Sequence, residues 1–514
     1  MNRPQPTAIN LPPAPAARCD RVFRIANHDE ALHIWREAGV SNQVLVHIDA
    51  HHDLWPVGEG ELTIANFLCP ALHEKIVREL YWVVPDGAFA TSHARRHVIR
   101  HLKKLIRGYK GPAHPIGQAA DVMRTEIAGV PLTVCTIASL PALPDPVLLD
   151  IDTDFLVIPR VTFADADVLA PVPWIWPDEL LRALAGKLPR AEIATIAESV
   201  EGGYTPLQWK YLAEELLLRL RGGAAPSQFD AVDLMRQAAT AADFALAERL
   251  YLSASKLWAE SAAPWLQLSH LYAAEGLWDQ ARDAYARALR LDASCDTCYN
   301  SAGPKLSSYG RFAAAEVEYR RMLKLYPDDA YSHLGQGWLA LERRRWLDAE
   351  SHLRRALQLR PDLVDAHRDL GHALAHMGRT EDALQAYDSC LKLVLTGHRP
   401  LTSPIASCSE HVMMDPYHGQ VHAARARLQE RLGRLAEALR GYQMALAFKY
   451  EVPWVHVRLA RLYMRSGEWG GAIVQLWRAL VVLPPAIRRD VRWKWRKLRG
   501  AFDRAAARSA AEAG

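Results

Sequence analysis

The spacing of apolar residues in the first half of the chain predicts short strands separated by amphipathic helices. Apolar runs of strand length cover residues 22–25, 44–48, 81–84, 132–137 and 147–151. Helical spacing predicts helices over residues 28–38, 61–80 and 92–106, the first of them capped by Asn27 and stopped by Gly39. Strands that alternate with helices are typical of a parallel sheet covered by helices on both faces. In such α/β sheets, ligands bind at the carboxyl ends of the strands.

The second half of the chain repeats itself at a constant interval. The same interval separates Gly276 from Gly310 and Gly433 from Gly467, and Gly378 lies two intervals after Gly310, with Arg344 between them. An alanine and then a bulky apolar residue follow each of these positions at fixed distances: Ala281 and Tyr285, Ala315 and Tyr319, Ala349 and Leu353, Ala383 and Tyr387, Ala438 and Tyr442, and Ala472 and Leu476. Each interval predicts two antiparallel helices, in which the alanine allows close approach, the bulky residue fills the groove and the glycine makes the turn.

This pattern resembles the tetratricopeptide repeat family, and we expect an all-α solenoid over residues 232–485. One helical pair cannot bury its own apolar stripe, so the pairs must stack. The resemblance implies protein–protein contacts through the repeats; the alternative is a purely structural array. Gly378 and Gly433 lie further apart than one interval, so the extra residues form an insert near residues 395–416, which we expect to be a loop.

Composition limits what lies outside the two domains, which we place at residues 21–225 and 232–485. Residues 1–20 are rich in Pro and Ala and are predicted to be a disordered tail, and residues 486–514 are predicted to be a basic capping helix and tail. The formal net charge is +4, too small to indicate nucleic acid or membrane as the main partner. No apolar run reaches the roughly 18 residues of a membrane span. Seven scattered cysteines without a signal-peptide pattern predict a cytoplasmic protein.

Two acidic motifs lie at the ends of predicted strands. Asp49, His51 and Asp53 follow the strand 44–48 at alternate positions, and Asp150 and Asp152 lie at the end of the strand 147–151. Alternate residues project to one side, so these side chains are expected to converge. Buried carboxylates are costly unless a cation pairs with them, and this oxygen-rich set suits two divalent ions such as Mn2+ better than one tetrahedral zinc. The alternative is a pair of acidic turns in which Asp caps helices.

These motifs resemble the signatures of the arginase or ureohydrolase family, an Asp-x-His-x-Asp and an Asp-x-Asp that hold two manganese ions. The resemblance implies an arginase-like sheet over residues 21–225, with Asp49 and Asp150 bridging the ions. It implies Asp53 as a ligand of one ion, and His51 and Asp152 as ligands of the other. The remaining ligand of the family is a histidine at the start of a helix after the first strand, and His28 has that position.

Within this family, the sequence more closely resembles a divergent branch, the peptide arginases. These enzymes convert arginine residues of ribosomally made peptides into ornithine. It rests on residues 27–35, 46–54, 64–70, 82–86 and 149–155. The family anchors the guanidinium group with a glutamate before a glycine, and Glu201 before Gly202 matches it. The usual proton-shuttle histidine of the family is absent, as are its Gly-rich run at the first ligand and the Asp-Pro after the second motif. We therefore expect an arginine-containing peptide or protein as substrate, held by the repeats, with ornithine and urea as products.

In this hypothesis Asp152 orients the attacking hydroxide and Glu201 pairs with the guanidinium group. The candidates for the proton shuttle are His52, His73, His93, His97 and His114, and Asp154 is either a supporting acid or a turn residue. Three alternatives stay open: a ureohydrolase acting on a small guanidine, a single-zinc enzyme similar to the deacetylases, and a non-catalytic repeat scaffold.

Overall fold

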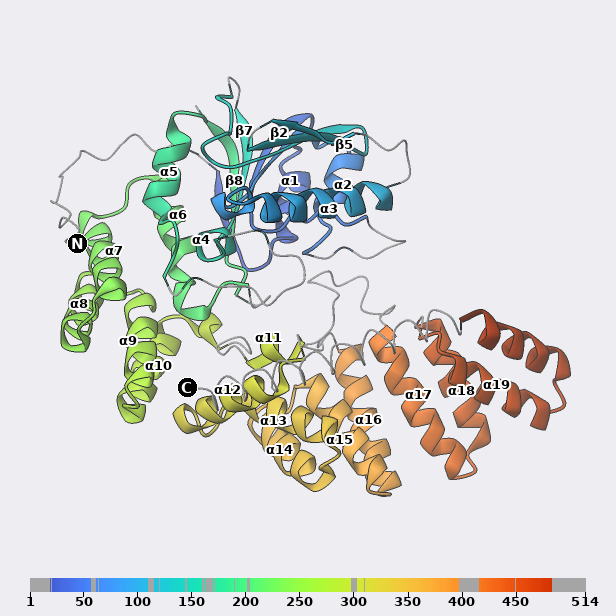
Figure 1. Cartoon of the computed structure of the whole chain (residues 1–514). Coiled ribbons are helices and arrows are strands. Elements are labelled where there is room, and N and C mark those ends of the chain that lie inside the picture. Colours follow the sequence, from blue (N-terminus) through green and yellow to red (C-terminus); the bar gives the residue numbers. More distant parts are fainter. Residues whose placement is uncertain are drawn as a thin grey trace, which may run out of the picture. The chain divides into compact units, whose positions relative to one another are not determined.

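The computed structural model describes residues 19, 21–56, 62, 64–109, 115–119, 121–143, 146–159, 161, 170, 172–188, 190–200, 204–296, 303–308, 310–396, 416–448 and 450–482. The predicted N-terminal tail apart from Cys19, most of the predicted insert and the predicted basic capping helix therefore lie outside the described residues. The chain divides into two compact units, Met1–Cys295 and Asp296–Gly514, whose elements are labelled in Figure 1. None of the helices in the described ranges has the length and apolar character needed to cross a membrane.

The first unit contains an eight-stranded sheet in the order β1-β8-β7-β2-β3-β6-β5-β4. Its strands are β1 (Val22–Ile25), β2 (Gln43–Ile48), β3 (Val77–Val83), β4 (Gly117–Ala119), β5 (Val122–Ile127), β6 (Val130–Cys135), β7 (Val147–Asp152) and β8 (Ala191–Ala197). The six strands from β1 to β6 in this spatial order are parallel. Strands β5 and β4 are antiparallel additions at one edge, so the sheet is mixed and the expectation of a purely parallel sheet was wrong there.

A two-residue turn produces this antiparallel edge. Ile127 at the end of β5 is paired with Val130 at the start of β6, and Ala128 and Gly129 between them have φ values of 53° and 80°. Hairpins with two-residue turns need positive φ at both positions, which Asn-Gly or Asp-Gly pairs usually supply. Alanine at the first position conceals this signal in the sequence, which is why β4 and β5 were not predicted.

The predicted helix over residues 61–80 was too long, and the predicted strand over residues 81–84 began too late. Helix α2 spans only Leu68–His73, and Lys75 then adopts a left-handed conformation with a φ of 58°. Strand β3 begins at Val77 and is paired on both sides, with β2 and β6. A strand buried between two parallel neighbours does not alternate apolar and polar residues, so periodicity does not separate it from a buried helix. Strand β8 was missed because alanine, which recurs along it, has low strand propensity.

Helices cover both faces of the sheet. Helices α1 (Glu30–Glu37), α2 and α3 (Ser92–Gly108) follow β1, β2 and β3, and their buried residues join one hydrophobic core with the sheet. Helix α5 (Pro177–Ala185) connects β7 to the parallel strand β8. This connection crosses the sheet toward β1, whereas the connections that contain α1, α2 and α3 cross it toward β6. Because such crossovers are right-handed, α5 lies on the face opposite to α1, α2 and α3. The remaining short elements of this region are η1 (Asp86–Ala88), α4 (Asp154–Val157) and η2 (Leu207–Trp209), followed by α6 (Tyr211–Arg221).

The first two helical pairs of the repeat region belong to the same compact unit as the sheet. They are α7 (Pro226–Thr240), α8 (Phe244–Leu257), α9 (Ala263–Ala274) and α10 (Trp278–Leu291), followed by η3 (Ala293–Cys295). Lys210, just before α6, is buried and donates to Asp292 at 2.7 Å. The Gln267 side chain of α9 donates to the Gln208 carbonyl of η2 at 2.9 Å. Polar contacts therefore join these repeats to the sheet domain.

The second unit is helical throughout its described part. Its helices are α11 (Gly303–Ser308), α12 (Phe312–Leu325), α13 (Ala330–Glu342), α14 (Trp346–Leu359), α15 (Val364–His376), α16 (Thr380–Leu395), α17 (Pro416–Arg431), α18 (Leu435–Ala447) and α19 (Pro453–Arg465), and residues 469–482 form a further helix. Consecutive helices pack as antiparallel pairs, which confirms the predicted all-helical solenoid (Figure 1).

The residues that mark each repeat adopt the conformation expected of turns between paired helices. Gly276, Gly310, Gly378, Gly433 and Gly467 have φ values between 74° and 81°. The third mark in chain order, Arg344, has a φ of 58° although it carries a side chain. The constant interval therefore places a left-handed residue after the first helix of each pair.

The predicted small and large positions fill the space between helices. All six marked alanines are buried, and so are Tyr285, Tyr319, Leu353, Tyr387 and Tyr442. Leu476 differs, because 41% of it is exposed on the last described helix. The rings of Tyr319 and Tyr387 lie so close to Gly335 and Gly371 that a Cβ on either glycine would overlap them. Large residues on one helix thus require glycine on its neighbour.

Replacing Arg344 with glycine should stabilise the repeat that contains α13 and α14. The left-handed conformation costs a residue with a side chain about 1–2 kcal/mol, and the flexibility of glycine in the unfolded chain offsets about half of that gain. Amide hydrogen exchange in α13 and α14 of the full chain, followed by mass spectrometry, should slow several-fold. The reciprocal change, Gly378→Ala, should speed exchange in α15 and α16, and equal exchange in parent and Arg344→Gly would show that Arg344 carries no strain.

Candidate metal centre

The two acidic motifs lie at the point where the strand order of the sheet reverses. Strands β2 and β7 are neighbours, with Val46 paired with Leu149 and His47 with Asp150. From β2 the chain continues to β3 on one side, and from β7 it continues to β8 on the other side. Loops that leave two adjacent strands in opposite directions diverge, and ligands of α/β sheets bind between them.

Two series of alternate residues converge at this switch point. The first leaves β2 and comprises His47, Asp49, His51 and Asp53, and the second leaves β7 and comprises Asp150, Asp152 and Asp154. All of them except His51 are buried. The structure therefore brings together the residues of both predicted motifs, and it adds His47 from inside β2 and Asp154 from the start of α4.

His28 lies at the centre of these carboxylates. It stands in the turn between β1 and α1, and its Nε2 is 2.8 Å from Asp150 Oδ2. Its Nδ1 is 3.3 Å from Asp49 Oδ2, 3.1 Å from Asp53 Oδ2 and 3.2 Å from Asp152 Oδ2. One imidazole thus touches four carboxylates from both motifs.

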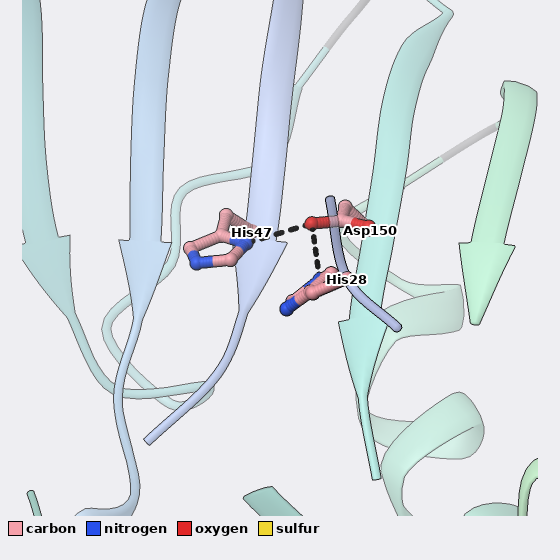
Figure 2. Close-up of side chains that lie close together, drawn as sticks. All are labelled: His28, His47 and Asp150. Atoms are coloured by element: carbon pink, nitrogen blue, oxygen red, sulfur yellow. Dashed lines mark hydrogen bonds and ion pairs between the residues drawn. The ribbon is translucent and has the colours of Figure 1, made fainter. Parts of the chain in front are cut away.

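His47 contacts the same carboxylates from inside the sheet. Its Nδ1 is 2.8 Å from Asp150 Oδ2, the oxygen that His28 also contacts, as Figure 2 shows. Its Nε2 is 3.4 Å from Asp49 Oδ2. The ring centroid of Phe67 lies 6.3 Å from that of His47 and 4.9 Å from that of His28. Phe67 is fully buried, so an apolar ring excludes water behind both imidazoles.

His51 forms the more exposed side of the centre with Asp154. Its Nδ1 is 2.7 Å from Asp154 Oδ2 and 3.5 Å from Asp49 Oδ1. The His51 side chain is 23% exposed, whereas that of Asp154 is fully buried. The resemblance groups His51 with Asp152 as ligands of one ion, which stays a prediction. In the structure, Asp154 is the carboxylate that lies nearest to His51, and Asp152 lies against His28.

Neighbouring donors orient the carboxylates. Thr195 of β8 donates to Asp150 Oδ1 at 2.5 Å, and Ser199, just after β8, donates to Asp152 Oδ2 at 2.6 Å. The Trp82 indole N–H donates to the Asp49 carbonyl at 3.0 Å. Each of these bonds comes from an adjacent strand or its end, so sheet pairing sets the direction of the acids.

Two residues of the centre have unusual backbone conformations. Asp53 has a φ of 49° and Ser199 has a φ of 50°, both in the left-handed region although neither is glycine. Such conformations persist only where the surrounding structure enforces them, and they concentrate at functional sites. Here they direct the Asp53 carboxylate to His28 and the Ser199 hydroxyl to Asp152.

Burial and charge act in opposite directions on the titratable groups. Burial alone would lower the pKa of His28, but Asp150, Asp152 and Asp49 raise that pKa well above its usual value. Burial would likewise lower the pKa of His51, but Asp154 and Asp49 raise that pKa well above its usual value. Burial raises the pKa of Asp152, with the charge of Asp49 adding to it. The neighbouring carboxylates therefore favour the protonated form of both imidazoles, against the effect of burial.

The donor set fits divalent metal ions. Three groups have ligand atoms close enough together to share an ion: His28 with His47 and Asp150, His28 with Asp49 and Asp53, and Asp49 with His51 and Asp154. Among the described residues, four of these ligand atoms are buried without a hydrogen-bond partner: Nδ1 of His28, Nε2 of His47, Oδ2 of Asp49 and Oδ1 of Asp154. Unsatisfied buried atoms are rare in folded proteins, and a metal ion would satisfy them.

The predicted guanidinium anchor, Glu201, lies outside the described residues, as do Gly202 and Gly203. Two described residues that flank this segment, Ser199 and Tyr204, contact the centre. Ser199 before it donates to Asp152, and Tyr204 after it has its ring centroid 4.8 Å from that of His51. The Tyr204 and Thr205 amides both donate to the Ser199 carbonyl at 3.1 Å.

The histidines considered as proton shuttles are not equivalent. His52 is next to the centre, but its Nδ1 accepts from the Leu54 amide at 2.8 Å and its Nε2 lies 2.7 Å from His101 Nε2. Burial and the neighbouring imidazoles hold its pKa well below the usual value, so it is a poor proton donor near neutral pH. His73 and His93 are exposed on α2 and α3, His97 is partly exposed on α3, and His114 lies outside the described residues.

His47 is the residue that sequence reasoning overlooked. It precedes Asp49 by two positions and therefore belongs to the same alternating series as Asp49, His51 and Asp53. Continuing that alternation one step back into the predicted strand would have found it. Asp154 had been left open between a supporting acid and a turn residue. In the structure its side chain lies 2.7 Å from His51 Nδ1, and its backbone amide donates to Asp152 Oδ1 at 2.9 Å.

Comparison with known proteins bears on the repeats. A family model described as a tetratricopeptide repeat matches residues 308–363 and 334–393. The chain contains tetratricopeptide repeats. The anaphase-promoting complex subunit CDC16 of Saccharomyces cerevisiae is 26% identical over 153 residues, which are 28% of this chain and 18% of that protein. The cellulose synthase operon protein C of Pseudomonas fluorescens is 27% identical over 163 residues, 31% of this chain and 11% of that protein.

Two solved structures show the same limited likeness. The crystal structure of MamA matches 36% of this chain and 96% of its own chain, with 17% identity and a TM-score of 0.29. That of the anaphase-promoting complex hetero-tetramer Cut9–Hcn1 matches 63% of this chain and 55% of its own chain, with 14% identity and a TM-score of 0.32. The match to both curated relatives spans less than a fifth of their length, so the repeats identify an architecture and not an activity.

Manganese should stabilise the first unit through the centre. A ligand present at about 100 times its Kd adds about 2.7 kcal/mol to the free energy of unfolding, which raises Tm by roughly 5–10 °C. Calorimetry of metal-free protein with and without Mn2+ measures this shift, and metal content after gel filtration gives the stoichiometry. Asp150→Asn should abolish both the Tm shift and the bound manganese. Asp121→Asn, a change of a half-exposed acid in the same domain, should preserve both. Equal shifts in the two variants would place the bound metal elsewhere.

His47 provides a test of the ligand set. If it holds a metal, His47→Gln should weaken Mn2+ binding by about 10-fold to 100-fold, the usual effect of removing a residue that binds or orients the metal. Titration followed by electron paramagnetic resonance of free Mn2+ measures this affinity. His73→Gln on the exposed end of α2 is the matched control. Unchanged affinity in His47→Gln would leave His47 as a packing residue of the sheet.

Proposed function

We propose that the first unit is a manganese-dependent hydrolase that converts arginine residues of a peptide or protein into ornithine and urea. The observation that carries the proposal is the cluster of five aspartates and three histidines, all buried except His51, at the switch point between β2 and β7. In the reaction water adds to the guanidinium carbon, the bond from that carbon to the side-chain nitrogen breaks, and the amine leaves with a proton.

The cluster supports two ions rather than one. His28 belongs to two of the three ligand groups and Asp49 belongs to two, so neighbouring ions would share ligands. Carboxylate-rich ligation with imidazole suits Mn2+ among the common divalent ions. Two divalent ions held there would act as Lewis acids and would lower the pKa of water, which provides a nucleophile near neutral pH.

The protein groups around the ions would orient the reactants. Ser199 fixes one oxygen of Asp152, and the backbone amide of Asp154 donates to the other at 2.9 Å, so this carboxylate is held in one orientation from which it can accept a proton from the attacking water. A guanidinium group is planar with several N–H donors and pairs best with a carboxylate. Glu201 is our candidate for that carboxylate, because the segment that contains it begins and ends at the centre.

The repeats favour a macromolecular substrate. Tetratricopeptide repeats suggest a protein-binding scaffold, and here the first two helical pairs are part of the same compact unit as the sheet. A small guanidine would need no such surface. We therefore assign the repeats the role of holding the peptide or protein whose arginine enters the centre.

The direct test is mass spectrometry of arginine-containing peptides incubated with the manganese-loaded full chain. Each modified arginine should lose the mass that separates it from ornithine, and urea should appear in equal amount. Asp150→Asn should abolish the reaction. Glu201→Gln should raise KM without loss of manganese, because it removes the guanidinium partner and no metal ligand. Urea release from free guanidines without any change in peptides would replace the peptide substrate with a small one.

A second candidate is a deacetylase with a single zinc. The observation in its favour is the group of Asp49, His51 and Asp154, an Asp-His-Asp set at the more exposed side of the centre. A catalytic zinc ion has three protein ligands and one open position. The three side chains of this group would provide the three ligands. One bound zinc and release of acetate from acetyl-lysine peptides, without urea from arginine peptides, would establish this function instead. A protein that binds no metal would be a scaffold.

A further inference from the structure

Helix α3 carries an unusual concentration of positive charge. Its sequence from Ser92 to Gly108 contains six Arg and Lys residues and three histidines, and no acidic residue. One face is buried against the sheet through Val98, His101, Leu102, Leu105 and Ile106. The other face exposes Arg96, Arg100, Lys103, Lys104 and Arg107, which we name the α3 cation surface.

The spacing of these residues makes a continuous stripe. Arg96, Arg100, Lys103 and Arg107 follow one another at intervals of four, three and four residues, which places them on one side of a helix. Lys104 lies beside them. At a rise of about 1.5 Å per residue, the stripe is roughly 16 Å long, the length of about five residues of an extended peptide.

The α3 cation surface is not neutralised by the described part of the protein. Among the described residues, no ion pair joins any of its five cations to a carboxylate. The ion pair of α3 with Asp121 is made by Arg95, which is outside the surface. Like charges three and four residues apart destabilise a helix. Within the part of the chain that the structure describes, these cations repel one another, and an anionic partner would relieve that repulsion.

This surface adjoins the loop that carries Asp53. His101 Nε2 is 2.7 Å from His52 Nε2, and the Lys104 ammonium lies 4.8 Å from the Trp55 ring centroid. Gly108 faces Pro56 so closely that a Cβ would lie 2.8 Å from the proline Cγ. Just beyond the helix, the Tyr109 hydroxyl donates to the Leu54 carbonyl at 2.7 Å. A chain bound along α3 would therefore lie beside a loop of the metal centre.

We propose that the α3 cation surface binds an acidic segment of a peptide. An acidic peptide suits the surface better than a nucleic acid does. Single-stranded nucleic acids bind proteins by stacking their bases on aromatic side chains as well as by charge. Helix α3 contains no Phe, Tyr or Trp, and the neighbouring aromatic residues are already engaged, Trp55 by Lys104 and Tyr109 by the Leu54 carbonyl. In combination with the proposed function, on which this second step rests, the acidic segment and the arginine belong to one substrate.

The proposal can be tested without any hydrolysis. Fluorescence anisotropy of the full chain would be measured with a labelled glutamate-rich peptide that contains no arginine, and with the same peptide in which every Glu is Gln. The protein should bind the first peptide in a salt-dependent manner and the second at least about tenfold more weakly. Failure of the arginine chemistry would not change this result, so the two proposals can fail separately.

The decisive variant is Arg96→Glu/Arg100→Glu/Lys103→Glu, which reverses exposed charges. It should lower the affinity for the acidic peptide at least about tenfold. A matched control, Arg21→Glu/Arg78→Glu/Arg124→Glu, makes the same change in net charge at exposed positions of the sheet domain, outside both α3 and the repeats, and should bind as the parent does. Thermal unfolding of both variants verifies the fold. Equal binding by the two variants would overturn the α3 site, and tighter binding of a single-stranded oligonucleotide of equal charge would overturn the acidic-peptide ligand.

Discussion

Five carboxylates buried at one edge of a sheet need positive charge nearby, and this requirement organises the first unit. Ionised carboxylates removed from water are costly unless they are paired and hydrogen-bonded. Imidazoles lie against these carboxylates: His28 contacts four aspartates, His47 contacts Asp150 and His51 contacts Asp154. Several side-chain atoms of the cluster are buried without a hydrogen-bond partner, and this observation supports the proposed metal site.

The sheet supplies the convergence that this chemistry needs. Two strands that are distant in sequence, β2 and β7, become neighbours, and the period of two along each strand directs alternate residues into one place. Thr195 of β8 and Ser199 just after it donate to the carboxylates of Asp150 and Asp152, and Trp82 of β3 donates to the backbone carbonyl of Asp49. The left-handed backbone at Asp53 and Ser199 completes the arrangement at a cost in strain that the rest of the fold sustains.

The repeats are built on a different principle, because each helical pair contacts chiefly its neighbours. Tyr319 and Tyr387 fill grooves that only glycine on the facing helix leaves open, so packing is specified pair by pair. The first two pairs nevertheless belong to the compact unit of the sheet, joined to it by Lys210 with Asp292 and by Gln267 with Gln208. A protein-binding architecture thus begins within the unit that carries the metal centre, while α3 presents positive charge beside the loop of Asp53.

The sequence by itself determined the local features of this protein, because they depend on residues close in the chain. The constant interval between repeats predicted the helical pairs and their left-handed turns, and alternation after two strands predicted Asp49, His51, Asp53, Asp150 and Asp152 as one cluster. Tertiary structure alone decided what depends on pairing between distant segments: β8 between β1 and β7, the antiparallel edge at β4 and β5, and the start of β3 at Val77, inside the predicted helix over residues 61–80. It also decided that His47 joins the cluster and that Asp154, rather than Asp152, lies against His51, since contacts across neighbouring strands have no counterpart in local spacing.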